Sequence, residues 1–323
     1  MNALRVVFLG SDRWSVPSLE ALAESEHDIV LVGTREAKPA GRGSKLTPTP
    51  VADAARRLGL ELIEPPTVRA GPGFDAIGAA EPDVLAVVAY GEILPSAVLG
   101  LPRVAPVNLH FSLLPELRGA APVQRALLEG LAVTGVTTIR MDEGMDTGPV
   151  LLRAEEAVDE DDDAGSLGDR LAGIGARLLV DTVDRLAGGD LEPQPQDEAA
   201  ATFAPKLGPD DRWVDWNRPA GEIVRLVRAL APDPAASTQL RGDTLKLLRA
   251  TERPEAGEPG TVVTVRKDGF VVAAGEGAVA PLEVAPAGRK RMTAGEFVRG
   301  ARLEQGERLG PKTAGGDSGP NGR

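Results

Sequence analysis

The sequence contains no cysteine, and it is poor in histidine and in aromatic residues. Without cysteine the chain can form no disulfide, no thiolate nucleophile and no thiolate metal site. His27 and His110 are the two histidines, which excludes a multi-histidine metal site. Any mechanism that needs an imidazole must use one of these two residues, and we expect no bound metal.

Long hydrophobic runs are also missing. The longest apolar run, Val84–Tyr90, falls well short of the ~20 residues that a membrane-spanning helix needs. The first residues, Met1–Arg5, lead directly into a strand-like run, so we expect no signal peptide. The apolar fraction is 42% and the charged fraction 26%, as in ordinary globular proteins. We therefore expect a soluble, cytosolic protein that does not bind membranes.

The charge is divided unevenly along the chain. The 323 residues carry a net charge of −12 and are enough for two domains. Residues 205–323 contain 19 Lys and Arg against 16 Asp and Glu, a net charge of +3, so residues 1–204 carry −15. Strong acidity argues against a nucleic-acid partner, but the mildly basic C-terminal part does not. The asymmetry predicts different tasks for the two parts.

Strand-like and helix-like segments alternate through residues 1–204, which we predict to form the N-terminal domain. The apolar runs typical of buried strands are Leu4–Leu9, Asp28–Gly33, Val84–Ala89, Val107–His110 and Val136–Met141. The helical segments are Ser15–Ser25, Val51–Leu58 and Gly165–Gly188. This alternation predicts an α/β fold with a doubly wound, Rossmann-like parallel sheet. The Pro- and Gly-rich segment Thr34–Pro50 predicts a long functional loop without helix or strand.

Residues 205–310 have a different pattern. One helix is predicted over Ala220–Leu230, and short strand-like runs follow it at Thr244–Leu248, Thr261–Val265, Gly269–Ala273 and Val279–Val284. Such spacing predicts a small C-terminal β-barrel or sandwich. We interpret residues 190–204 as a linker and the Gly-rich residues 311–323 as a disordered tail.

The usual nucleotide and nucleophile motifs are absent. Gly10–Ser15, which follows the first strand, lacks the G-x-G-x-x-G fingerprint, and the chain contains neither a P-loop nor a G-x-S-x-G elbow. Open parallel sheets bind ligands beyond the carboxyl ends of their strands. Three segments meet that description: Ala89–Pro95, Asn108–Pro122 and Asp142–Pro149.

Asn108 and His110 stand out in the second of these segments. They lie two residues apart on a strand, so both side chains point to one face. An amide donor and an imidazole there can stabilise an oxyanion and move a proton, and Asp146 in a Gly-flanked loop can orient the imidazole. On spacing alone, a buried structural histidine and a turn aspartate remain the better interpretation. His27 has no comparable company, and we interpret it as structural.

Longer motifs change that balance. NLHFSLLPELRGAAPVQRALLEG (Asn108–Gly130) resembles the signature of the folate-dependent formyltransferases, and DEGMDTG (Asp142–Gly148) resembles their catalytic-aspartate loop. KPAGRGSKLTPTPV (Lys38–Val51) is similar to the insertion loop of the branch that acts on methionyl-tRNA. TFAPKLGPDDRWVDWNRPAGEIVRLVRAL (Thr202–Leu230) fits the same branch. The resemblance extends to about Gly310.

The resemblance implies formyl transfer from 10-formyltetrahydrofolate to the amino group of methionine on initiator methionyl-tRNA. Asn108 and His110 would then be oxyanion donors, with His110 moving the proton under the influence of Asp146. The segment implied to lie against the folate is Ser112, Leu113, Leu114 and Pro115. The residues implied to contact tRNA are Arg42, Lys45, Arg289 and Lys290. The C-terminal part would be an oligonucleotide-binding (OB-like) barrel, and we expect a monomer.

The chain departs from the family pattern at three places. Gly10-Ser11-Asp12 replaces Gly-Thr-Pro, Glu116-Leu117 replaces a basic–aromatic pair, and Ala231-Pro232-Asp233-Pro234 replaces Asn-Pro-Trp-Pro. The last two put details of RNA contact in doubt. The alternatives are the same chemistry on an amino-sugar nucleotide, an inactive RNA-binding relative, and a nicotinamide-dependent oxidoreductase, which the missing glycine fingerprint disfavours.

Overall fold

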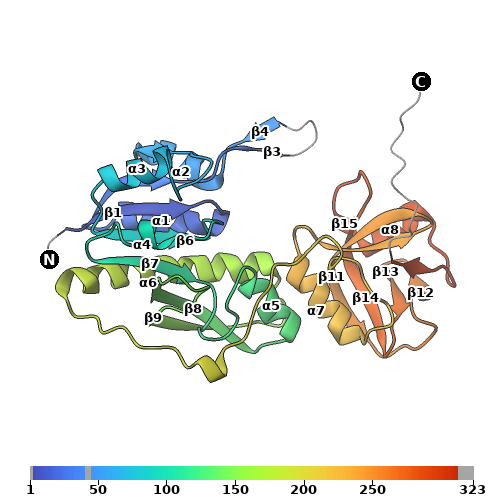
Figure 1. The fold of residues 1–323 in the computed structure, drawn as a ribbon. Coiled ribbons are helices and arrows are strands. Elements are labelled where there is room, and N and C mark those ends of the chain that lie inside the picture. The colour runs from blue at the N-terminus through green and yellow to red at the C-terminus, as the bar shows by residue number, and fades with distance from the viewer. Residues whose placement is uncertain (1–2, 41–44, 312–323) are drawn as a thin grey trace. The chain divides into compact units, whose positions relative to one another are not determined.

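The computed structural model describes residues 3–40 and 45–311 (Figure 1). The chain packs into two compact units. The first unit contains Met1–Pro122, Val133–Ala157 and Gly168–Pro205, and the second contains Val123–Ala132, Val158–Leu167 and Lys206–Arg323. Arg42 and nearly all of the predicted tail lie outside the described residues. No helix among the described residues is long and apolar enough to cross a membrane.

A seven-stranded sheet forms the centre of the first unit, in the order β5-β2-β1-β6-β7-β8-β9. Its strands are β1 (Arg5–Gly10), β2 (Asp28–Gly33), β5 (Leu62–Ile63), β6 (Val84–Val88), β7 (Ala105–His110), β8 (Val133–Arg140) and β9 (Val150–Ala157). The predicted α/β class is confirmed, and the pairs from β5 to β7 are parallel. However, β8 pairs antiparallel with both of its neighbours, β7 and β9, so the expectation of a wholly parallel sheet is wrong at this edge. The connection between the end of β8 and the start of β9 is too short for the crossover that parallel neighbours need, so β8 and β9 pair antiparallel.

The helices of this sequence region are α1 (Val16–Ala23), α2 (Pro50–Leu58), α3 (Pro72–Ala79), α4 (Ser96–Leu99), α5 (Pro122–Glu129) and α6 (Ala164–Gly188), with short 3-10 turns η1 (Arg13–Ser15) and η2 (Glu198–Ala200). Local sequence sets the limits of α2. Its first residue is Pro50, the Thr49 hydroxyl accepts the Ala52 N–H at 3.0 Å, and Gly59 ends it with φ +69°. Every residue of β6 is buried, as expected for a central strand covered on both faces.

Two short strands within Thr34–Pro50 pair as a hairpin, and these strands project from the first unit's sheet in Figure 1. β3 (Lys38–Ala40) pairs antiparallel with β4 (Lys45–Thr47), so the expectation of a loop without strands is wrong. Pro39 is paired with Leu46, and a two-stranded ribbon accepts proline because no third strand needs its missing N–H. The two strands form their own sheet and do not join the seven-stranded one.

The second unit is built on a curled antiparallel sheet, a half-barrel, which agrees with the small OB-like β-barrel expected from the sequence. The strand order is β12-β13-β14-β11-β10-β16, with β15 paired to β14. Its elements are α7 (Ala220–Leu230), β10 (Ala236–Leu240), β11 (Asp243–Arg253), β12 (Val262–Arg266), β13 (Gly269–Ala273), β14 (Ala278–Pro286), β15 (Met292–Thr293), α8 (Ala294–Ala301) and β16 (Leu309–Gly310). Leu309 pairs with Leu240 and also donates its N–H to the Gly260 carbonyl at 2.7 Å, which links the two edges of the sheet.

The acidic run Asp159–Asp163 packs within the second unit. Arg228 on α7 donates to the backbone carbonyls of Asp159 and Asp162, each at 2.6 Å. Burial lowers the pKa of Arg228, although the nearby carboxylates oppose that shift. Arg249 adds an ion pair with Asp161 at 3.1 Å. These contacts explain why a segment that the sequence assigns to the N-terminal domain belongs to the other unit.

Candidate active site

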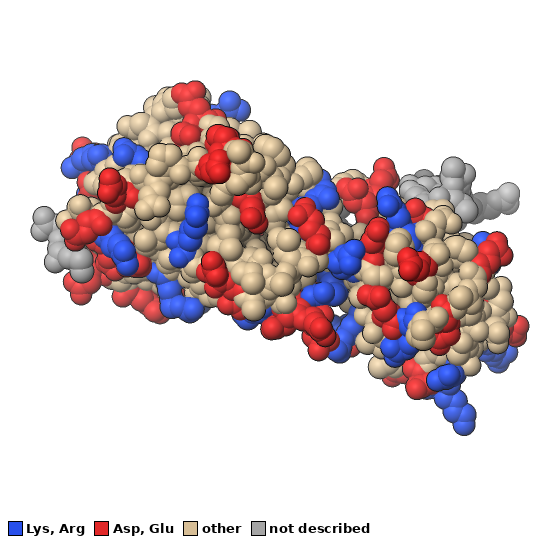
Figure 2. All heavy atoms as spheres, turned by 90° about the horizontal axis from the view of Figure 1, so that it is seen from below, with Lys and Arg blue, Asp and Glu red and all other residues tan. Residues whose placement is uncertain are grey.

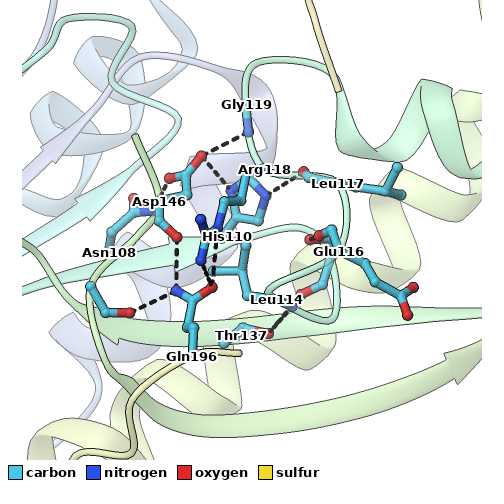
Figure 3. A network of polar contacts seen from close by, with 12 residues as sticks. Asn108, His110, Leu114, Glu116, Leu117, Arg118, Gly119, Thr137, Asp146 and Gln196 are labelled. Atoms are coloured by element: carbon cyan, nitrogen blue, oxygen red, sulfur yellow. Dashed lines mark hydrogen bonds and ion pairs between the residues drawn. The ribbon is translucent and has the colours of Figure 1, made fainter. Parts of the chain in front are cut away.

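Asn108 and His110 lie at the carboxyl end of β7 and converge with Asp146 (Figure 3). Asn108 Nδ2 donates to Asp146 Oδ1 at 3.4 Å, and His110 Nδ1 lies 3.6 Å from Asp146 Oδ2. The intervening Leu109 is buried on the other face of the strand, so the alternation of β7 presents both polar side chains together. The structure therefore brings the three sequence-predicted residues into one group within the first unit.

Asp146 occupies the turn between β8 and β9 in an unusual conformation. Its φ is +58°, in the left-handed region, where a non-glycine residue typically costs about 1–3 kcal/mol. The backbone N–H of Gly119 donates to Asp146 Oδ2 at 2.8 Å and helps to fix the carboxylate (Figure 3). Such a conformation persists only where surrounding contacts hold it, and here the Gly119 N–H and the Gln196 side chain both bind the turn.

The ring of His110 is almost fully buried and is held by the backbone of Leu117. His110 Nε2 lies 3.0 Å from the Leu117 carbonyl oxygen. A carbonyl can only accept, so Nε2 carries a hydrogen and the neutral ring keeps its lone pair on Nδ1, facing Asp146. We expected Asp146 to orient the imidazole, but the Leu117 carbonyl sets the tautomer of the His110 ring. Asp146 is placed to stabilise the charge that appears when Nδ1 takes up a proton.

A second polar group supports these loops. Gln196 donates from Nε2 to the Asp146 and Gly148 carbonyls at 2.8 and 2.7 Å. Its Oε1 accepts from the Arg118 guanidinium at 2.8 Å, and Arg118 also binds Glu198. The hydrogen bond with Glu198 raises the pKa of Arg118 and lowers that of Glu198. Sequence reasoning missed Gln196, because its Pro- and Gln-rich surroundings are typical of a linker.

The predicted folate segment directly follows His110. Ser112 and Leu114 are fully buried, while Leu113 and Pro115 are half-buried. The Ser112 hydroxyl donates to the Glu116 carbonyl at 2.6 Å, and Leu114 packs in a small core cluster. Only Leu113 and Pro115 therefore have side-chain surface to offer a ligand, and contact with folate stays a prediction.

The predicted tRNA residues lie elsewhere. Arg289 and Lys290 are exposed in the loop between β14 and β15 of the second unit. The next residue, Arg291, is ion-paired with Glu283 at 2.6 Å. Lys45 begins β4. On the face drawn in Figure 2, basic and acidic residues are interspersed, and no large area carries one sign.

Metal chemistry has no evident site in residues 3–40 and 45–311. No group of three or more His, Asp or Glu side chains is arranged there to hold an ion. The chemistry available to the Asn108, His110 and Asp146 group is hydrogen-bond donation and proton transfer. Both are the demands of acyl transfer between two bound substrates.

Comparison with known proteins identifies the family. Residues 4–183 match the formyl transferase family, and residues 206–302 match the formyl transferase C-terminal domain. The chain belongs to the formyl transferase family. The methionyl-tRNA formyltransferase of Magnetococcus marinus is 44% identical to this formyl transferase over 310 residues, covering 96% of this chain and 99% of the relative. The methionyl-tRNA formyltransferase of Pseudomonas fluorescens SBW25 is 46% identical over 276 residues, covering 85% and 87% of the two chains.

Solved structures share the fold of this formyl transferase. HypX from Aquifex aeolicus, in complex with tetrahydrofolic acid, superposes with a TM-score of 0.64 at 20% identity over 92% of this chain. The chain spans about half of HypX, namely 47% of its length. WlaRD, a sugar 3N-formyl transferase, superposes with a TM-score of 0.64 at 14% identity, covering 90% of this chain and 100% of WlaRD. At such identities the likeness establishes the fold alone.

Proposed function

We propose that this formyl transferase moves the formyl group of 10-formyltetrahydrofolate to the methionine amino group of initiator methionyl-tRNA. The near-complete coverage of relatives named methionyl-tRNA formyltransferase supports the substrates. The observation that carries the mechanism is the convergence of Asn108, His110 and Asp146, with the Asp146 carboxylate within 3.6 Å of both partners.

His110 is the proton-transfer group in this proposal. The methionine nitrogen must lose a proton when it bonds to the formyl carbon, and His110 Nδ1 has the free lone pair to accept it. The imidazolium then lies 3.6 Å from the Asp146 carboxylate, which stabilises it in a nearly dry site. The same proton is available for the folate nitrogen when its bond to the formyl carbon breaks. Protons therefore balance without a further acid or base.

Asn108 is the main oxyanion donor. One of its two amide hydrogens is directed to Asp146 Oδ1, and the other is left for the former formyl oxygen. A donor fixed in this way needs no reorganisation when negative charge develops, and one such donor is worth roughly 3–4 kcal/mol. The protonated His110 Nδ1 is placed to add a second bond.

In this proposal the first unit binds the folate, and both units contribute contacts to the tRNA. We infer that Ser112–Pro115 lies beside the folate, with Leu113 and Pro115 providing its apolar surface. Arg42 and Lys45 of the hairpin and Arg289 and Lys290 of the second unit are the proposed phosphate contacts. We further infer that the N-terminal part, residues 1–204, is catalytic, that residues 205–310 bind tRNA, and that the enzyme acts as a cytoplasmic monomer.

The deciding experiment measures transfer of labelled formyl from 10-formyltetrahydrofolate to three acceptors. They are charged initiator tRNA, charged elongator tRNA and an amino-sugar nucleotide. We expect efficient transfer to initiator methionyl-tRNA only. Transfer to the amino sugar instead, as the fold of WlaRD would permit, would contradict the proposed acceptor while leaving the chemistry intact.

A further inference from the structure

Gln196 uses both of its amide hydrogens on the turn that contains Asp146. The Nε2 group donates to the Asp146 carbonyl at 2.8 Å and to the Gly148 carbonyl at 2.7 Å. These two oxygens lie on either side of Thr147, so the side chain holds the backbone directly after the left-handed Asp146. The turn is thus held by a side chain as well as by its own backbone.

Arg118 fixes the orientation of that amide. Gln196 Oε1 accepts from Arg118 Nε at 3.2 Å and from Nη2 at 2.8 Å. A guanidinium can only donate and a carbonyl can only accept, so a flipped Gln196 amide would lose all four bonds. Arg118 is 2% exposed and is itself paired with Glu198 at 2.8 Å, which keeps it in place.

The same link reaches the other side of the site through the backbone of Arg118. Its preceding residue, Leu117, holds His110, and its following residue, Gly119, donates to the Asp146 carboxylate at 2.8 Å. Figure 3 shows these residues surrounding the His110 ring. Arg118 and Gln196 therefore tie the loop that orients the imidazole to the turn that supplies the carboxylate.

Gln196 itself is anchored by a segment that we name the strap, Gln194–Ala204. Gln194 exchanges two backbone hydrogen bonds with Val150 at the start of β9, at 2.7 and 2.8 Å. Thr202 accepts the N–H groups of Leu117 and Arg118 at 2.8 and 2.9 Å. Hydrogen bonds thus fix the strap on both sides of Gln196, which keeps Gln196 in place beside the turn that contains Asp146.

We propose that Gln196 is a positioning residue for formyl transfer. It holds Asp146 in the left-handed conformation that directs the carboxylate toward His110 and Asn108, and this hold on Asp146, rather than its bonds with Arg118, accounts for its effect on turnover. This inference rests on the proposed function for its kinetic test, but its structural test is independent of any activity.

The kinetic test compares Gln196→Ala and Gln196→Glu with Gln194→Ala. The glutamate keeps the size and the Arg118 contact but cannot donate to the two carbonyls. We expect both Gln196 variants to lower kcat by 10-fold or more, with the KM for each substrate changed less than threefold. Gln194→Ala, whose structural bonds are made by its backbone, should stay within twofold of the wild type.

A second background separates positioning from general damage. In an Asp146→Asn enzyme the carboxylate is already lost, so adding Gln196→Ala should lower the residual kcat by less than threefold. An equal loss in both backgrounds, or an unchanged kcat in the wild-type background, would overturn the inference.

The structural test follows hydrogen exchange of the Gly119 amide, whose acceptor is Asp146 Oδ2. We expect exchange at Gly119 at least 10-fold faster in Gln196→Ala and Gln196→Glu, and unchanged in Gln194→Ala. Normal protection of Gly119 in both Gln196 variants would refute the positioning role. If the Gln196 variants lost protection at Gly119 but the wild-type enzyme formylated none of the tested acceptors, the proposed function would be refuted. The role of Gln196 in positioning Asp146 would still be supported.

Discussion

At the scale of single residues, the two histidines have opposite roles. His110 touches Asp146 and the Leu117 carbonyl, whereas the His27 ring accepts the Leu4 N–H at 3.2 Å and contacts Asp184 at 3.1 Å. We expect His110→Ala to lower turnover by 100-fold or more, because the proton acceptor is lost. Asn108→Ala and Asp146→Ala should cause losses of the same order, with folate binding largely kept.

The matched control is His27→Gln. It should lower the melting temperature, because a buried hydrogen-bonded group is disturbed, yet leave turnover at 25 °C within a few-fold of the wild type. Single-turnover formyl transfer and thermal unfolding measure the two effects separately. Near-normal turnover in His110→Ala would contradict the mechanism, since the sequence offers only one other imidazole.

Tyr90 gives a residue-scale prediction about stability. It is the only tyrosine, its side chain is buried, and its hydroxyl has no hydrogen-bond partner among the described residues. Burial, helped by the Glu92 carboxylate, raises the pKa of Tyr90 to about 12. A raised pKa means that the unfolded chain ionises first, so the free energy of unfolding should fall as the pH rises from about 10 to 12.

Urea unfolding at neutral and alkaline pH tests this expectation, with tyrosinate absorbance reporting Tyr90 alone. Tyr90→Phe should abolish the alkaline loss attributable to this residue. At neutral pH it should be neutral or stabilising by about 1 kcal/mol, since an unpaired buried hydroxyl is removed. A strongly destabilised Tyr90→Phe protein would show that the hydroxyl is bonded after all.

The sequence predicts some residues of the site and not others, for a physical reason. Asn108 and His110 could be predicted because the alternation of side chains along a strand, and the position at its carboxyl end, determine where they point. The Leu117 carbonyl was not, because a backbone oxygen leaves no mark on residue identity. Gln196 was missed because its role depends on the strap lying against Asp146, a tertiary contact that no local pattern encodes.

At the scale of elements, the β3–β4 hairpin is structurally separate from the main sheet. Lys38 and Thr47 face each other across its base, so replacing residues 38–47 by a short Gly-Ser link needs little rearrangement. We expect this variant to fold and bind folate normally but to raise the KM for initiator methionyl-tRNA by about 10-fold, because Arg42 and Lys45 are removed.

A double variant, Arg42→Ala with Lys45→Ala, is the matched control because it keeps the hairpin length. It should reproduce most of the effect on KM. Lys38→Ala, a charge change at the base of the hairpin, should have a smaller effect. If the shortened enzyme kept the wild-type KM for tRNA, the hairpin would have no part in acceptor binding.

Element prediction from sequence was most successful where local signals are strong. Ala220–Leu230 was predicted with the bounds of α7, because its apolar residues recur at helical spacing. β9 was not predicted, because its apolar start is short and the exposed, charged residues Arg153 and Glu155 interrupt the rest of the strand. The direction of β8 could not be predicted either, since the direction of a strand in a sheet depends on its pairing rather than on its composition.

At the scale of the whole molecule, truncation is a poor test of the second unit. Removing residues 206–323 would also strip partners from Val123–Ala132 and Val158–Leu167, which pack in the same unit. Substitutions are cleaner. We expect Arg289→Gln with Lys290→Gln to weaken tRNA binding and to flatten the slope of log affinity against log salt by about one per lost phosphate contact.

Arg291→Gln is the neighbouring control. Arg291 is already ion-paired with Glu283, so its substitution should change the slope less. Binding titrations of charged initiator tRNA at several salt concentrations measure both. A slope that stays the same after both Arg289 and Lys290 are neutralised would exclude this loop from RNA contact.

The interleaving of the two units has a consequence for the order in which the chain is made. The backbone carbonyls of the Asp159–Asp163 run cannot be bound by Arg228 until that residue has been synthesised, and it lies 66 residues beyond Asp162. At 5–20 residues per second, ribosomal synthesis takes roughly 3–13 s to deliver that partner. Until then the run lacks its arginine partner. We expect its five hydrated carboxylates to keep the nascent segment from associating with other chains. The negative charge of the N-terminal part is thus expected to protect this segment while the chain is still unfinished.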